Sequence, residues 1–378
     1  KMMIDFKNLL MKIKFGAKRV FLSIIRKIKG CILKTFASKK YVEFDLNNTR
    51  SVLFLRYDKI GDMIVTTPVF RELKSVYPQV KIIVLASEIN KNVLNNNPYV
   101  DEIYINHKDC FLKDLSILLK LRRMSIDVAI EFDHSVVPHA IFRLKLINPK
   151  KVISAKKDGR YGIDGDKLSL YDFYTNRNDI MHFRDIWLNT LNPFGIIAKS
   201  NDYEVYPSES SFMLADNFCF QFDRKIKVGI NLEGSSEDRK INIDTFKDIC
   251  LSLKKIYSNI QIILISAPSK YDYYCSVVDN INLEFVEISY KTDSILDVCA
   301  LISKMDLIIS PDTSIVHIAS MYNVPIIACY KDDIIHFNHF GPVSDSQKII
   351  FGNNYQIGIY FKTDKLDFLQ SLVVKRKE

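Results

Sequence analysis

The chain has 378 residues, of which 48% are hydrophobic and 26% are charged. These values are typical of a globular protein of two domains, and they exclude a disordered or fibrous chain. No uncharged apolar run reaches the roughly 18–20 residues that span a bilayer, so we expect no ordinary transmembrane helix. The seven cysteines are scattered and form no CxxC pair, which argues against a zinc ribbon or a disulfide framework and favours a reducing, cytoplasmic compartment.

The positive charge is concentrated at the N-terminus. Residues 1–40 carry twelve Lys or Arg and one acid, whereas the rest of the chain has a net charge of −2. Between residues 6 and 36, apolar side chains recur at helical spacing with basic residues among them, which predicts a basic amphipathic helix within a segment 1–45. Such a helix suits peripheral contact of residues 1–40 with an anionic membrane. The alternatives are a helix packed on the body and nucleic-acid contact, which the nearly neutral body disfavours.

After residue 45, short apolar runs alternate with helical patterns. The expected strands are Val52–Leu55, Ile82–Leu85, Ile103–Ile105, Val128–Phe132 and Lys151–Ser154, followed by Val228–Leu232, Ile262–Ile265, Phe285–Ile288, Leu307–Ile309 and Ile326–Cys329. The expected helices are Pro68–Tyr77, Leu112–Arg123, Phe183–Leu191, Ile243–Tyr257, Ser294–Lys304 and Ser314–Tyr322.

Apolar strands between amphipathic helices are typical of parallel sheets covered on both faces. The two series therefore predict two doubly wound α/β domains, 46–205 and 206–378, the second ending in a C-terminal helix. Ligands of such sheets bind beyond the carboxyl ends of the strands, so the segments after the strands are the places to search for a site. No GxGxxG motif follows a strand and no Walker A motif is present, which disfavours dinucleotide oxidoreductases and P-loop proteins.

The first candidate segment, residues 56–62, follows the first strand. Gly61 permits a tight turn or the close approach of a ligand. Asp62 at the edge of the sheet can serve as a general base toward a sugar hydroxyl. The alternative is a carboxylate that only caps a helix, and Thr66-Thr67-Pro68 predicts that this helix has proline in its first turn.

The second candidate segment, residues 231–240, follows the first strand of the second series. Gly234, Ser235 and Ser236 offer N–H groups and hydroxyls, and Arg239 and Lys240 offer positive charge for a diphosphate. The alternative interpretation is an exposed polar loop.

The third candidate segment, residues 310–317, follows a strand and opens a helix. Asp312 or Thr313 caps the helix, whose first N–H groups would bind an anion, and His317 lies about one turn in. The alternative is a capped helix with a packed histidine. His336 and His339 could form a metal pair, but they lack a nearby acidic cluster, and we expect loop residues and no metal site.

Three segments of the chain resemble glycosyltransferase family 9, the ADP-heptose:lipopolysaccharide heptosyltransferases. Residues 55–78 (LRYDKIGDMIVTTPVFRELKSVYP) are similar to the family's N-terminal signature. Residues 181–196 (MHFRDIWLNTLNPFGI) are similar to a family helix that begins with His, and residues 310–330 (SPDTSIVHIASMYNVPIIACY) to its Asp-Thr-Gly segment. The resemblance covers roughly residues 50–345.

The resemblance implies a GT-B fold and an inverting, metal-independent transfer of a sugar. The donor would be a nucleotide sugar, such as ADP-heptose, and the acceptor a lipid-linked lipopolysaccharide core at the cytoplasmic face of the inner membrane. No other cofactor and no nucleic acid would take part. By position, Asp62 would be the catalytic base, with Gly61 in the adjoining loop. The donor would be held by Ser235, Ser236, Arg239, Asp312, Thr313, Ser314 and His317.

Three departures from the family pattern leave the donor open. Glu233 replaces a small residue after the strand, Ser314 replaces the glycine after Asp-Thr, and Lys270 stands where the family has an acidic contact. These departures keep an alternative in view, a non-catalytic protein of the same fold that binds a nucleotide sugar or a glycan.

Overall fold

The structure is a computed structural model that describes residues 22–234, 236–352, 354–363 and 367–377. Within these residues the chain forms two parallel sheets of six strands each. The strands of the first sheet are β1 (Ser51–Leu55), β2 (Lys81–Ala86), β3 (Glu102–Ile105), β4 (Val128–Glu131), β5 (Lys151–Ala155) and β6 (Phe173–Thr175). Those of the second are β7 (Ile226–Asn231), β8 (Ile260–Ile265), β9 (Val286–Ile288), β10 (Leu307–Pro311), β11 (Ile326–Tyr330) and β12 (Gln347–Phe351).

Both sheets have the same topology. The first has the order β3-β2-β1-β4-β5-β6, and the second has the equivalent order β9-β8-β7-β10-β11-β12. The register is continuous across the centre of the first sheet, where Val52 pairs with Ile82 on one side and with Val128 on the other. This is the doubly wound, Rossmann-like arrangement that the sequence predicts, with the reversal of strand order beside the central strand.

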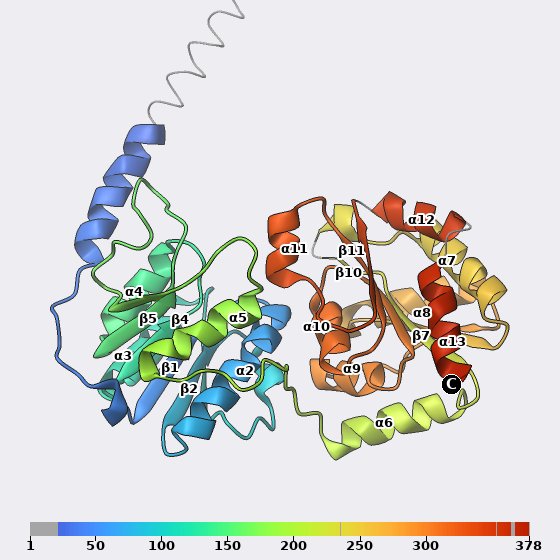
Figure 1. The fold of residues 1–378 in the computed structure, drawn as a ribbon, viewed down its shortest axis with the longest axis horizontal. Helices are drawn as coiled ribbons and strands as arrows, with labels where there is room; N and C mark the ends of the chain where they lie inside the picture. The colour runs from blue at the N-terminus through green and yellow to red at the C-terminus, as the bar shows by residue number, and fades with distance from the viewer. Residues whose placement is uncertain (1–21, 235, 353, 364–366, 378) are drawn as a thin grey trace, which may run out of the picture.

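Helices cover both faces of each sheet (Figure 1). The first domain contains α2 (Ile60–Val76), α3 (Phe111–Arg123), α4 (Pro138–Ile147), α5 (Phe183–Leu188) and the 3₁₀ helices η1 (Leu46–Asn48), η2 (Lys91–Leu94) and η3 (Asn189–Phe194). The second contains α6 (Glu209–Phe220), α7 (Ile243–Ile256), α8 (Tyr271–Ile281), α9 (Ile295–Ile302), α10 (Ser314–Met321), α11 (Ile334–Phe340), α12 (Asn354–Lys362), α13 (Asp367–Lys377), η4 (Glu237–Arg239) and η5 (Pro268–Lys270).

The start of α2 corrects the sequence-based expectation. The helix begins at Ile60, and Pro68 lies inside it rather than in its first turn. Proline has no N–H to donate to the carbonyl oxygen of Ile64, but the Thr67 hydroxyl donates to that oxygen at 2.8 Å. The proline is therefore tolerated, and the helix extends back to include Gly61 and Asp62 in its first turn.

The two domains pack directly on each other. One apolar cluster runs from the first domain, including Phe70 and Trp187, into the second, including Ile308 and Ile318. In Figure 1, α2 and α5 of the first domain face α10 and α11 of the second. The segment that connects the domains runs without helix or strand from residue 198 to residue 208.

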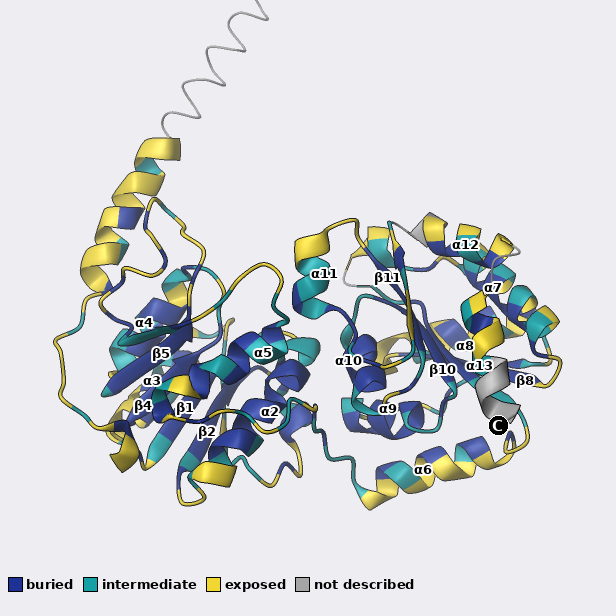
Figure 2. Ribbon diagram, in the orientation of Figure 1, coloured by how far each residue is buried: buried dark blue, intermediate teal, exposed yellow. Residues whose placement is uncertain are grey.

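An N-terminal helix of residues 22–36 lies against the first domain (Figures 1 and 2). Ala37 is buried, and a Cβ atom at Gly30 would lie 2.1 Å from the carbonyl oxygen of Tyr161, so glycine permits this close approach. The opposite face is apolar and exposed, and it carries Ile24, Ile28, Ile32 and Phe36. The predicted amphipathic pattern upstream of residue 22 lies outside the described residues.

Candidate active site

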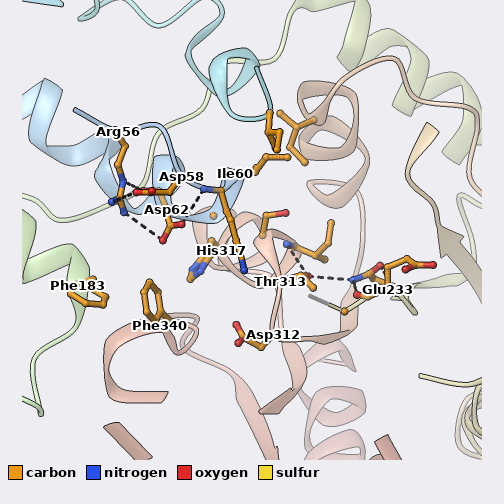
Figure 3. A pocket seen from close by; sticks show the side chains of 18 of the residues that line it. Arg56, Asp58, Ile60, Asp62, Phe183, Glu233, Asp312, Thr313, His317 and Phe340 are labelled. Carbon is orange, nitrogen blue, oxygen red and sulfur yellow. Dashed lines mark hydrogen bonds and ion pairs between the residues drawn. The ribbon is translucent and has the colours of Figure 1, made fainter. Parts of the chain in front are cut away.

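A cleft of about 1370 Å³ lies between the two domains and collects all three candidate segments. Its first wall contains residues 56, 58–62 and 132–134, at the carboxyl ends of β1 and β4. Its second wall contains residues 231–239 in part, together with 265–268, 312–317 in part and the α11 region. Figure 3 shows Asp62 and His317 near each other, with Asp312 and Thr313 on the same side as His317.

Asp62 occupies the first turn of α2 and lines the cleft. One carboxylate oxygen, Oδ2, accepts a hydrogen bond from the backbone N–H of Lys59 at 3.2 Å, so the residue caps its helix as well as facing the cleft. The other oxygen, Oδ1, lies 3.5 Å from Nη2 of Arg56. The side chain is 20% exposed, which leaves it accessible to a ligand.

Arg56 fixes this corner of the site. Its Nη1 donates to Asp58 at 3.1 Å, and its Nε donates to the backbone carbonyl of Asp62 at 3.1 Å. The guanidinium is buried and lies 5.5 Å from the ring centroids of both Phe132 and Trp187. An arginine that donates to several acceptors and packs on aromatic faces is a rigid support, so the orientation of Asp62 is set before any ligand binds.

Gly61 lies where the two domains approach each other closely within the cleft. A Cβ atom at this position would lie 2.9 Å from Cδ2 of His317 and 3.6 Å from the Cα atom of Ser314. Glycine therefore lets the first turn of α2 approach the first turn of α10. Burial is the largest influence on His317 and lowers its pKa, so the imidazole is neutral at pH 7.

The carboxylate of Asp312 contacts two basic side chains of the second domain, Arg239 and His336. Its Oδ2 atom accepts from Nη1 of Arg239 at 2.8 Å and lies 2.8 Å from Nε2 of His336. Burial alone would raise the pKa of Asp312, but the hydrogen bond and charge of His336, with His317 and Arg239, lower it overall. Asp312 is therefore ionised and holds Arg239 at the cleft.

The N-terminus of α10 lines the cleft. Thr313 is the N-cap, and its hydroxyl accepts from the N–H of Ile315 at 3.3 Å. The buried amide of Asn231 donates to the hydroxyls of Ser310 and Thr313 and to the carbonyl of Glu233. Asn231 therefore ties the end of β7 to the start of α10, a role that sequence analysis did not assign to it.

Of the other residues predicted in the second candidate segment, Gly234 lines the cleft, whereas Ser236 and Lys240 do not. Ser235 lies outside the described residues. Ser236 is exposed and its hydroxyl donates to Asp238 at 2.5 Å, while Lys240 pairs with Glu237. The described residues that line the cleft do not include Ser236 or Lys240, and they do not include Lys270.

Glu233 does line the cleft, and its carboxylate accepts a hydrogen bond from the Tyr274 hydroxyl at 2.6 Å.

The two histidines of α11 have different partners, one within the second domain and one in the first. His336 bonds Asp312, and His339 packs on Phe183 with a ring-centroid distance of 4.5 Å. No group of three or more His, Cys, Asp or Glu residues suited to a metal occurs in the part of the chain that the structure describes.

Next to them, Nε2 of His182, the N-cap of α5, lies 3.0 Å from the carbonyl oxygen of Gly341. Burial is the main reason that the pKa of His182 falls to about 4.

A buried ionic network beneath the first wall was not apparent from the sequence. The ammonium group of Lys157 pairs with Glu131, and both side chains are almost fully buried. The same ammonium donates to the backbone carbonyl of Asp133 at 2.5 Å, and the Tyr171 hydroxyl donates to Glu131 at 3.0 Å. Asp133, two residues after Glu131, lines the cleft.

The fold of the two domains and the cleft between them define a structural class. Two facing Rossmann-like domains with a cleft between the carboxyl ends of their sheets form the GT-B fold. A crystal structure of a family 9 glycosyltransferase from Veillonella parvula is similar, with a TM-score of 0.66, 18% identity, and coverage of 85% of this chain and 91% of that one. The Escherichia coli heptosyltransferase WaaC, solved with ADP, is similar with a TM-score of 0.62, 14% identity, and coverage of 86% and 98%.

Sequence comparisons identify the family. Residues 120–367 match the model of glycosyltransferase family 9 (heptosyltransferase). A protein of Escherichia coli K12 whose name assigns it to the lipopolysaccharide heptosyltransferases is 26% identical over 281 residues, which cover 73% of this chain and 72% of the relative. The chain belongs to glycosyltransferase family 9, and the protein is a glycosyltransferase of the heptosyltransferase type.

Proposed function

We propose that the protein transfers a heptose or a related sugar from a nucleotide diphosphate donor, such as ADP-heptose, to the core of a lipopolysaccharide. The transfer inverts the anomeric centre and needs no metal ion. The observation that carries this proposal is the contact at Gly61, which brings the Asp62 carboxylate of one domain next to the N-terminus of α10 in the other.

The donor diphosphate lies on the second domain, within residues 206–378. The N–H groups at the start of α10 and the guanidinium of Arg239 face the cleft, and both favour a phosphate. Because only Nη1 of Arg239 is bound to Asp312, the guanidinium fork has further donors for the diphosphate. These fixed donors stabilise the charge that grows on the leaving diphosphate, which is the task that a metal performs in other enzymes.

Asp312 does not contact the phosphate in this proposal, whereas Thr313 and Ser314 do. An ionised carboxylate repels a phosphate, so Asp312 acts by holding Arg239 and His336 in position. Thr313 and Ser314 present the helix N-terminus, and neutral His317 packs behind it against Gly61.

The acceptor lies against the first domain, within residues 46–205. Asp62 takes the proton of the attacking hydroxyl while the hydroxyl oxygen bonds to the anomeric carbon from the face opposite the diphosphate. The bond to the diphosphate breaks, and the nucleoside diphosphate leaves. Arg56 keeps the carboxylate aimed at the cleft through its contacts with Asp58 and with the backbone of Asp62.

Residues 1–40 hold the enzyme at the membrane that carries its acceptor. Within the described part of this segment, Ile24, Ile28 and Ile32 form an exposed apolar stripe flanked by Lys27 and Lys29. An apolar stripe enters the headgroup boundary and lysines meet anionic lipid. Among the described residues, no helix is both long enough and apolar enough to cross a bilayer.

The test is a binding panel followed by an assay of turnover. ADP and ADP-heptose are expected to raise the melting temperature, and purified protein is expected to transfer heptose to truncated, heptose-deficient lipopolysaccharide equally well with and without EDTA. Binding of the nucleotide sugar without any transfer would contradict the proposal and favour the non-catalytic alternative. Loss of transfer in EDTA would contradict metal independence alone.

A further inference from the structure

The carboxyl group of Asp133, in the first domain, faces the cleft without a cationic partner among the described residues. Asp133 follows β4 and lines the same wall as Asp58 and Asp62. Among the described residues, no Lys, Arg or His side chain lies within ion-pair distance of its carboxyl group. Its backbone is fixed, because its N–H donates to Glu131 at 2.7 Å and its carbonyl accepts from Lys157 at 2.5 Å.

The carboxyl groups of Asp133 and Glu131 are near enough for each to shift the pKa of the other, that of Asp133 upward. Two neighbouring carboxyl groups resist carrying a negative charge at the same time. Lys157 and the Tyr171 hydroxyl both bind Glu131, which is fully buried, so Glu131 keeps the negative charge. Of the two carboxyl groups, Asp133 is therefore the one that takes up a proton more readily.

Most of the surroundings of Asp133 favour the neutral form. Burial raises its pKa well above the ordinary value, and the charges of Glu131 and Asp58 act in the same direction. Lys157 opposes them, but its ammonium is already paired with Glu131. The hydroxyl of Tyr57 is buried, which raises its pKa, and it is therefore uncharged.

We propose that Asp133, as a neutral carboxylic acid, donates a hydrogen bond to an oxygen atom of the acceptor sugar and so helps to determine which acceptor binds. The proposal rests on the proposed function, because it assigns the wall of Asp62 to the acceptor. A neutral carboxyl group suits this wall, since Asp58 and Asp62 already supply negative charge. A third charge would repel the carboxylate or phosphate oxygens that anionic glycans carry.

The test compares Asp133→Asn with Asp133→Ala. Asparagine keeps an N–H donor but does not titrate, whereas alanine removes the donor. The Michaelis constant for truncated lipopolysaccharide is expected to rise about 3- to 10-fold in Asp133→Ala, the usual contribution of one hydrogen bond between uncharged groups, and to stay near the wild-type value in Asp133→Asn. Asp109→Asn, an exposed carboxyl of the same domain outside the cleft, is the matched control.

The pH dependence supplies the readout that a merely structural role would not change. As the pH rises through the raised pKa of Asp133, the wild-type enzyme loses its donor, so its Michaelis constant for the acceptor is expected to rise. The Asp133→Asn enzyme is expected to lack this rise. An unchanged Michaelis constant in Asp133→Ala would overturn the proposal. A loss of kcat at constant Michaelis constant in Asp133→Asn would also overturn it, because Asp133 would then accept a proton instead.

Direct binding separates this inference from the proposed function. Calorimetry with delipidated, truncated core oligosaccharide, without donor, is expected to show a 3- to 10-fold weaker affinity for Asp133→Ala than for wild type. If the wild-type enzyme transfers sugar and the variant binds the oligosaccharide equally well, only the role of Asp133 is wrong. If the wild-type enzyme neither transfers sugar nor binds the oligosaccharide, the proposed function fails, and the role of Asp133 fails with it.

Discussion

The substitution Gly61→Ala tests whether the contact between α2 and α10 belongs to the active arrangement. The new methyl carbon would lie 2.9 Å from Cδ2 and 3.4 Å from Nε2 of His317. Carbon atoms in ordinary contact are about 3.5–4.0 Å apart, so α2 and α10 must separate by roughly 0.5–1 Å. His317 is only 4% exposed and cannot swing away freely, and the strain therefore falls on the contact between the domains.

The expected effect on activity follows from the cost of this strain. Overpacking of this kind costs about 1–3 kcal/mol, which corresponds to a reduction of about 5- to 150-fold in the population of the arrangement in which α2 contacts α10. We expect kcat/KM for sugar transfer to fall within this range. Thermal stability is expected to change little, because alanine improves the helix by up to about 1 kcal/mol and the clash is relieved when the domains separate.

The assay pairs steady-state transfer with calorimetric melting, and Gly358→Ala is the control. Gly358 lies in α12, and a Cβ atom there would lie 3.3 Å from Cγ2 of Thr245, within the second domain and away from the cleft. The control is expected to transfer sugar at the wild-type rate. Wild-type kcat/KM in Gly61→Ala would refute the reasoning, since the contact would then have no part in catalysis.

Three further predictions concern the donor, the membrane and the buried network. Arg239→Ala is expected to weaken ADP about 10- to 100-fold and adenosine hardly at all, as measured by calorimetry, and equal losses would place Arg239 away from the phosphates. The double substitution Ile28→Ser and Ile32→Ser is expected to abolish co-sedimentation with anionic vesicles but to leave turnover on a delipidated acceptor unchanged. Undiminished sedimentation of this variant would exclude the helix as a membrane anchor.

Lys157→Met is expected to lower the free energy of unfolding by about 3–5 kcal/mol at pH 7, because the Glu131 carboxylate stays buried without its cation. In the wild type, burial raises the pKa of Glu131, but Lys157 and Asp133 lower it overall, so this stabilisation is present above the unfolded pKa and is lost as the pH falls. In the variant the pKa of Glu131 rises, so denaturant titrations are expected to show a smaller deficit in acid. A deficit independent of pH would contradict the assignment of the charge to Glu131.

The central strands and the GT-B fold could be predicted from the sequence because parallel strands buried on both faces form continuous apolar runs. The edge strands β6 (Phe173–Thr175) and β12 (Gln347–Phe351) were missed, since each is short or partly polar and has a neighbour on one side only. The start of α2 was misplaced because Pro68 is a common first-turn residue, and the sequence does not reveal that Thr67 satisfies the carbonyl of Ile64.

The features of the site that are local in the sequence could also be predicted, whereas those that depend on long-range contacts could not. Gly61-Asp62 and Asp312–His317 lie within single segments and could be recognised by motif. The partners that give them their chemistry come from distant parts of the chain, as Arg239 does for Asp312 across 73 residues. No local pattern marks such pairs, because burial and charge pairing emerge only when the two sheets bring their carboxyl ends together.

The most direct test of the central claim is the transfer rate of Asp62→Asn under saturating donor. The asparagine side-chain oxygen can still accept the hydrogen bond from the Lys59 N–H, and Arg56 keeps its bond to Asp58, so the fold and the affinity for ADP are expected to persist. The rate constant for heptose transfer to truncated lipopolysaccharide is expected to fall about 10²- to 10⁴-fold, the usual loss when a general base is removed. A correctly folded variant that transfers heptose at the wild-type rate would contradict the account.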